Sequence, residues 1–218
     1  MSAGTRGQYS NQVLVQFYGE FKPEDDPEES DALDAMMEDM GADFKDVPYR
    51  NTVRLMNKGA SRGFEQRRFV VTRAAMVHEA AAGMRAAFNG FWNEGTRVYL
   101  IGHGYWQEQF IGTFGAGAVA RMLVEAGMPK VKIISVVSCE LGQGGFAQAL
   151  QRDLFEFGQI KATLYTRNLP VRVDEAGFKE TYLPGSASEF QPKRMGAKAE
   201  WFWQGNSQLS RPVAARVK

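Results

Sequence analysis

Thiols, imidazoles and long apolar runs are scarce in this chain of 218 residues. Its one cysteine, Cys139, cannot form an internal disulfide, and with only two histidines it cannot build a zinc site from Cys and His ligands alone. The apolar runs are far shorter than the ~20 residues that span a bilayer, and the N-terminus has no apolar segment like that of a secretory signal. A formal net charge of +1 points to neither nucleic acid nor a membrane surface. We therefore expect no metal, no nucleic-acid partner and no membrane span, and any thiol chemistry would be catalytic.

Strands and helices alternate along the chain, as in an α/β domain. Buried strands are predicted at 12–18, 68–72, 97–106, 131–137 and 160–167, and helices at 74–91, 115–127 and 145–158. Strand, helix, strand at this spacing gives parallel strands joined by right-handed crossovers. We expect one domain over residues 1–218 with a mostly parallel central sheet flanked by helices, a core over about 12–205 and a loose tail at 206–218.

Three further segments are read from their turns and charges. Residues 171–183 predict a β-hairpin that turns at 174–177, and residues 197–205 predict another strand. Residues 23–40 carry nine acidic side chains and no Lys or Arg, and Ser30 could cap a helix there. Residues 50–73 are strongly basic, which fits a polyanion site, a solvated face or a neutraliser of the acidic segment.

Two residue types capable of catalysis follow two consecutive strands of the predicted sheet. His103 comes just after one strand, and Cys139 lies 36 residues later, just after the next. Catalytic groups of open parallel sheets gather outside the carboxyl ends of the strands, and neighbouring strands are roughly 5 Å apart. We therefore expect the imidazole and the thiol to share one edge, although a turn histidine and a small buried cysteine remain open alternatives.

A Cys/His pair fits acyl transfer. The thiolate is the nucleophile, and a histidine can take the thiol proton and later protonate the leaving amine. The backbone N–H groups of Gly104 and Cys139 could bind the oxyanion, and a helix beginning near Gly144 would add a positive dipole end.

The order of several motifs resembles the caspase-like cysteine peptidases of clan CD. The motifs are "LIGHG", "ISVVSCELG", "GFAQAL" and "YTRNLPVRVDEAGFKET". They are most similar to the autoprocessing cysteine protease domains of large bacterial toxins, of the MARTX and clostridial glucosylating kind, over about residues 97–205. The resemblance implies a caspase-like fold with a C-terminal β-hairpin flap, a His103–Cys139 dyad, and cleavage after leucine in the chain itself or in a host protein. It also implies a monomer secreted by a bacterium that acts in the host cytosol.

The resemblance further implies allosteric activation by inositol hexakisphosphate, which orders the flap through basic residues. Arg167 and Lys179 match basic positions of the family, and Phe178 stands where a second basic residue is expected. Looser matches are Lys193, Arg194 and Lys198. The alternative function is that of a catalytically silent relative that binds a host protein or a polyanion through the same surface.

Overall fold

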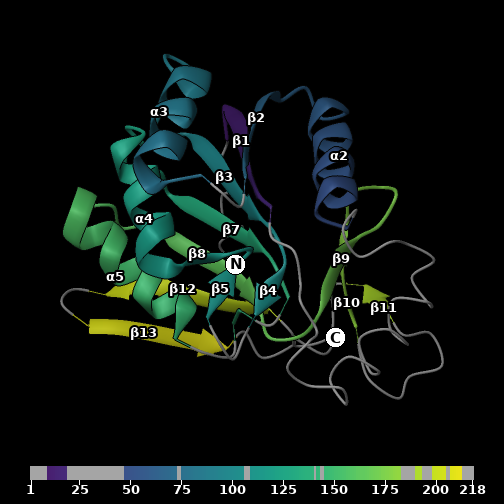
Figure 1. Ribbon diagram of the computed structural model, residues 1–218. Helices are drawn as coiled ribbons and strands as arrows, with labels where there is room; N and C mark the ends of the chain where they lie inside the picture. The colour runs from purple at the N-terminus through teal and green to yellow at the C-terminus, as the bar shows by residue number, and fades with distance from the viewer. Residues whose placement is uncertain are drawn as a thin grey trace, which may run out of the picture.

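The computed structural model describes residues 9–18, 47–72, 75–105, 109–139, 141–142, 145–182, 190–192, 198–204 and 207–212, the last three ranges and residues 181–182 by their backbone alone. Their centre is a seven-stranded sheet in the order β13-β12-β8-β7-β3-β1-β2. Its five parallel strands are β1 (Asn11–Phe17), β2 (Glu65–Val71), β3 (Thr96–Ile101), β7 (Ile133–Val137) and β8 (Thr163–Arg167). Two antiparallel strands, β12 (Lys198–Gln204) and β13 (Ser207–Pro212), extend the sheet beyond β8. The predicted α/β class is confirmed, and the arrangement is consistent with a caspase-like fold (Figure 1).

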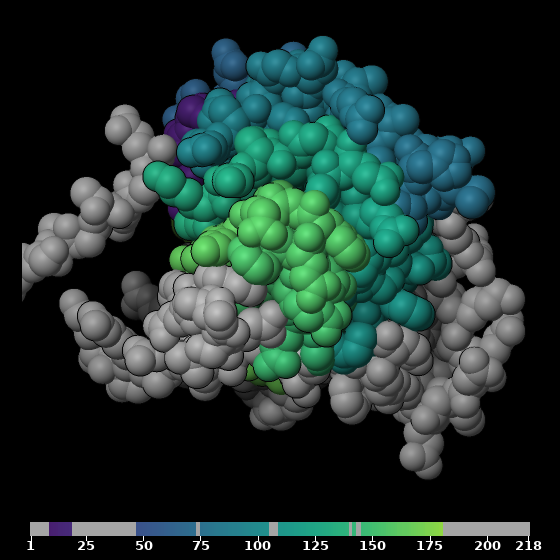
Figure 2. Space-filling model, turned by 90° about the vertical axis from the view of Figure 1, so that its left-hand side faces the viewer, coloured from purple at the N-terminus to yellow at the C-terminus, as the bar shows by residue number. Residues whose placement is uncertain are grey.

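Three helices cover one face of the sheet. They are α3 (Val77–Phe88), α4 (Ala116–Glu125) and α5 (Phe146–Gly158), and they follow one another over the face seen in Figure 2. Alternate residues of the strands, such as Val98, Leu100 and Ile134, point toward these helices and are fully buried. We call this side the helical face.

A helix that the sequence did not predict, α2 (Val47–Ala60), covers the opposite side. It packs on β1 and on a small antiparallel sheet made of β9 (Val171–Val173), β10 (Lys179–Tyr182) and β11 (Phe190–Pro192) (Figure 1). The hairpin β9–β10 is the predicted flap, and its turn passes through Gly177, whose φ is 75°. We call this side the flap face.

Two other features differ from expectation. The predicted strand 97–106 ends at Ile101, and after it β4 (Gly104–Tyr105) joins a second small sheet with β5 (Phe110–Ile111) and β6 (Phe114–Gly115). Residues 207–212, expected within a loose tail, form β13, which pairs antiparallel with β12.

The acidic segment 23–40 lies outside the described residues. Among the residues that are described, no helix is long and apolar enough to cross a membrane.

Candidate active site

The pairing of β3 with β7 brings His103 and Cys139 opposite one another. The ladder pairs Arg97 with Ile133 and continues to Ile101 with Val137, an offset of 36 residues. His103 and Cys139 are also 36 residues apart, so they occupy matching positions two residues beyond the last pair of the ladder. The two chains stay in contact there, because a Cβ placed on Gly104 would collide with the carbonyl oxygen and the backbone nitrogen of Cys139. The two residues predicted to bind the oxyanion therefore have adjoining backbones.

His103 lies where the winding of the sheet reverses. β1 has β2 on one side and β3 on the other, with α2 and α3 crossing on opposite faces. In open α/β sheets this reversal is where ligands bind, at the carboxyl ends of the strands. The carbonyl oxygen of His103 accepts a 2.7 Å hydrogen bond from the N–H of Gly112, which fixes its backbone. The side chain is buried, with 5% of its surface exposed, so a peptide can reach it only if neighbouring segments move.

Cys139 is half-buried and faces the flap. Its side chain packs against the apolar cluster of the flap face, to which Val137 and Val171 belong. The N–H of Val171 points to Sγ at 3.5 Å, and the carbonyl oxygen of Val171 lies 4.0 Å from it. The first strand of the flap thus lies directly against the candidate nucleophile.

The N-terminus of α5 lies where we expected it, with Gly145 as the N-cap and Phe146 as the first helical residue. The side-chain oxygen of Gln109 accepts a hydrogen bond from the N–H of Phe146. A side-chain oxygen there satisfies one of the free N–H groups of the first turn. Gln109 is a residue that the sequence analysis missed, and the N–H of Phe146 serves this cap rather than the sulfur.

A group of cations surrounds Tyr99 on the flap face of the sheet. The guanidinium of Arg97 lies 5.0 Å from the centre of the Tyr99 ring, and the ammonium of Lys179 lies 5.1 Å from it. The ammonium of Lys179 also donates to the hydroxyl of Ser135, at 2.5 Å. Burial, and to a lesser degree the charge of Arg97, lowers the pKa of Arg167 to about 10. Arg167 and Lys179 were among the predicted cofactor-binding residues, whereas Arg97, which is half-buried, was not.

Arg167 also connects this group of cations to the loop that follows Cys139. Its carbonyl oxygen accepts a 2.7 Å hydrogen bond from the N–H of Gly142. A Cβ at Gly142 would collide with Asn168 and with the carbonyl of Arg167, so only glycine allows this approach.

The remaining predicted cofactor residues are not all described. Lys193 and Arg194 lie outside the described residues, and Lys198 is described only as the backbone of β12, where it pairs with Arg167. Phe178, where the resemblance led us to expect a basic residue, has the ammonium of Lys58 at 3.2 Å from its ring centre. A cation from α2 therefore lies beside this position of the flap.

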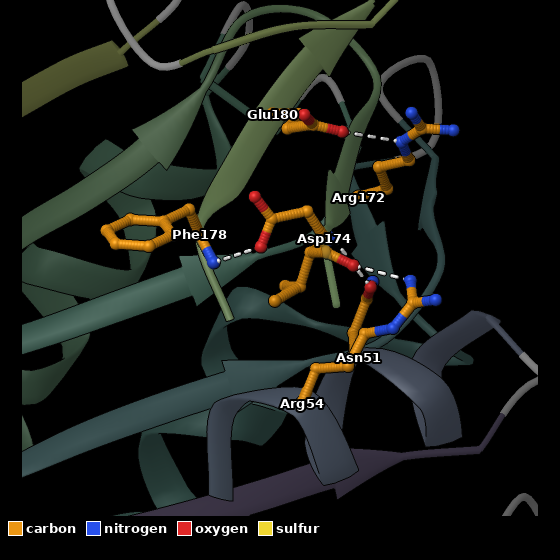
Figure 3. A network of polar contacts seen from close by, with 7 residues as sticks. Asn51, Arg54, Arg172, Asp174, Phe178 and Glu180 are labelled. Carbon is orange, nitrogen blue, oxygen red and sulfur yellow. Dashed lines mark hydrogen bonds and ion pairs between the residues drawn. The ribbon is translucent and has the colours of Figure 1, made fainter. Parts of the chain in front are cut away.

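Side chains of α2 hold the flap, a contact that the sequence analysis did not predict. Asn51 and Arg54 bond to the backbone of Val173 (Figure 3). Lys58 bonds to the carbonyl oxygen of Gly177. Part of the basic segment 50–73, namely Arg54 and Lys58, thus anchors the flap. A cleft of about 320 Å³ lies between α2 and the flap. Arginines and carboxylates both line this cleft, among them Arg50, Arg54, Arg172, Asp174, Glu175 and Glu180.

No family model and no curated protein matches this chain. Within the described ranges, no group of three or more His, Cys, Asp or Glu side chains could hold a metal ion.

Proposed function

We propose that the chain is a cysteine endopeptidase that uses His103 and Cys139 as a dyad. The observation that carries the proposal is the 36-residue offset of the β3–β7 ladder, which equals the separation of the two residues. Their position at the reversal of the sheet, where α/β enzymes bind ligands, supports it independently. The similarity to toxin autoprocessing domains names the substrate we propose, a peptide bond after leucine in the chain itself or in a host protein. On the same similarity we propose a bacterial effector that acts in the host cytosol.

The proposed reaction needs only the groups already described. The Cys139 thiolate attacks the carbonyl carbon of the scissile bond, and the N–H groups of Gly104 and Cys139 stabilise the oxyanion. His103 takes the thiol proton and gives it to the leaving amine, which leaves an acyl-enzyme. A water molecule, deprotonated by His103, then releases the acid and restores the thiol.

Inositol hexakisphosphate is the proposed activator, and the cations around Tyr99 suit it. Arg97, Arg167 and Lys179 would hold phosphate groups, since converging guanidinium and ammonium groups are what a polyphosphate needs. Among the described residues, Nε of Arg97 is buried without a hydrogen-bond partner, and the pKa of Arg167 is lowered by burial and by Arg97. A bound phosphate could accept from this Nε and would offset the cost of burying the charge of Arg167.

The test compares the wild type, Cys139→Ala and His103→Ala with and without inositol hexakisphosphate, using leucine-containing peptides and mass spectrometry of the protein itself. We expect cleavage by the wild type in the presence of the polyphosphate and none by either variant, in proteins with matching circular dichroism. Equal cleavage by wild type and Cys139→Ala would refute the dyad. Leu209-Ser210 is one bond of the chain to follow.

One observation favours the alternative, a catalytically silent relative that binds a polyanion or a host protein. His103 is buried and the sulfur lies against Val171, as would suit a residue kept for packing. A thiol-reactive peptide probe separates the two functions. A protease is labelled at Cys139 and loses the labelling in His103→Ala, whereas a silent relative stays unlabelled and still gains thermal stability from the polyphosphate.

A further inference from the structure

The backbone N–H and C=O groups on the outer edge of β9 bond to side chains instead of to another strand. β9 pairs with β10 on one side, and the N–H of Asp174 bonds to the carbonyl of Phe178. In an antiparallel ladder the hydrogen-bonding groups of successive residues point alternately to the two sides. Because Asp174 points toward β10, Val173 and Val171 both point their N–H and C=O groups the other way.

Two side chains of α2 occupy the outer edge at Val173. The Oδ1 of Asn51 accepts from the N–H of Val173 at 2.8 Å, and the guanidinium of Arg54 donates to its carbonyl oxygen at 2.6 Å (Figure 3). Together they make the two bonds that a neighbouring strand would make. Asn51 is 4% exposed and Val173 is fully buried, so removing the amide leaves the N–H of Val173 without its protein partner.

Two residues earlier in β9, at Val171, the same edge lies against the thiol of Cys139. The N–H of Val171 points to Sγ of Cys139 at 3.5 Å, and Val171 is 4% exposed. A backbone N–H aimed at sulfur favours the thiolate, the reactive form, whereas the carbonyl oxygen of Val171, 4.0 Å from Sγ, accepts from the thiol. The strength of that interaction depends on the position of β9. Asn51 holds β9 at Val173, two residues after Val171.

We infer that Asn51 is a positioning residue, which tunes the reactivity of Cys139 by holding β9 so that the N–H of Val171 points at the sulfur. The inference deepens the proposed function and rests on it for its biological meaning. The link itself concerns only the thiol and can be measured without proteolysis. It gives α2 a role in the chemistry although none of its bonds described above reaches the dyad.

The experiment measures the rate of Cys139 alkylation by iodoacetamide against pH in the full chain. We compare Asn51→Leu, which removes the amide at similar volume, with Asn57→Leu, the same change at an exposed position of the same helix. The midpoint of the profile reports the pKa of the thiol, and the plateau at high pH reports access to it. The titratable and charged side chains on the surrounding elements are the same in both variants. They are His103 after β3, Arg167 in β8, Arg54 on α2 and Asp174 in the flap turn.

We expect Asn51→Leu to raise the midpoint by half a unit or more, equal to a threefold or greater loss of thiolate at neutral pH. Asn57→Leu should leave it unchanged. Asn51→Gln keeps an uncharged accepting oxygen and should bring the midpoint back toward the wild-type value. If Asn51→Leu does not fold, Asn51→Ala, with Asn57→Ala as its control, takes its place with the same expectation.

The inference is overturned if Asn51→Leu, or Asn51→Ala in its place, shows the same midpoint as its Asn57 control in folded protein. It is also overturned if only the plateau changes, because Asn51 then controls access to the sulfur and not its pKa. Failure of the proposed function looks different. In that case no peptide is cleaved, while the midpoint still shifts between Asn51→Leu and Asn57→Leu.

Discussion

The two faces of the central sheet are built on different principles. The helical face buries a continuous apolar cluster under α3, α4 and α5, with large side chains such as Phe88 and Phe146 fully enclosed. The flap face has a smaller apolar cluster and buries polar groups beside it, among them Asn51, Ser135 and Arg167. Burying polar groups lowers stability unless each finds a partner. The comparison indicates that the helical face contributes most of the apolar packing, and it agrees with our proposal of a functional site on the flap face.

Phe88→Ala tests the structural side of this comparison and should have the largest effect on stability. Phe88 is fully buried and packs edge-on against Phe69 and close to Trp92. Truncation leaves a cavity and should lower the free energy of unfolding by about 3–5 kcal/mol, measured by urea denaturation. The pH midpoint of Cys139 alkylation should stay as in the wild type, and a shift there would show that the two faces are not independent.

Gly177→Ala tests how tightly the flap is held to α2. The residue has φ 75°, and a Cβ there would collide with the Cβ of Lys58 and the carbonyl of Arg54. We expect destabilisation of about 2–4 kcal/mol from backbone strain and overpacking together. Gly63→Ala is the matched control, since Gly63 has φ 74° and nothing within 4 Å of the added Cβ, and should lose only about 1 kcal/mol. Equal losses in thermal denaturation would contradict a tight contact between α2 and the flap turn.

Arg167→Met tests whether the buried charge of the flap face is kept for a ligand. The pKa of Arg167 is lowered to about 10 in the folded protein, mainly by burial. The unfolded chain therefore holds this proton more tightly, so the charge opposes folding at every pH below about 10. We expect the variant to be more stable at pH 7 by about 1–2 kcal/mol. It should also gain less thermal stability than the wild type from inositol hexakisphosphate, and an equal gain would remove Arg167 from the ligand site.

Lys58→Met should have the smallest effect. Its ammonium lies over Phe178 and bonds to the carbonyl of Gly177, but both contacts are near the surface. We expect a loss below about 1 kcal/mol in the free energy of unfolding, with the apolar stem still covering the ring. A loss as large as that of Gly177→Ala would mean that the cation, and not the close packing, holds the turn.

The parts of the fold that depend on local pattern could be predicted from the sequence. Apolar runs mark β1, β3 and β7 as buried strands, and the glycine after the turn at Asp174 marks the flap hairpin. The equal spacing of His103 and Cys139 from their strands was visible too, because parallel pairing turns a sequence offset into a shared edge.

What could not be predicted depends on contacts between distant residues. Asn51 reaches Val173 across 122 residues, and Arg54 reaches it across 119. A side chain that bonds to a backbone group leaves no trace in the partner's identity, since every residue except proline carries the same N–H and C=O. The helix α2 was not predicted because polar residues, Asn51 and Thr52, lie on its buried face, where an apolar stripe would be expected.

The exposed strand β2 at the end of the sheet bears on how the protein behaves at high concentration. Within the described residues it pairs with β1 alone, and it carries Arg67 and Arg68 side by side, both exposed. Two copies that approached edge to edge would bring these cations together, which disfavours strand addition between molecules. We therefore expect Arg67 and Arg68 to disfavour aggregation. Replacing both with uncharged residues should cause turbidity on storage before any loss of activity.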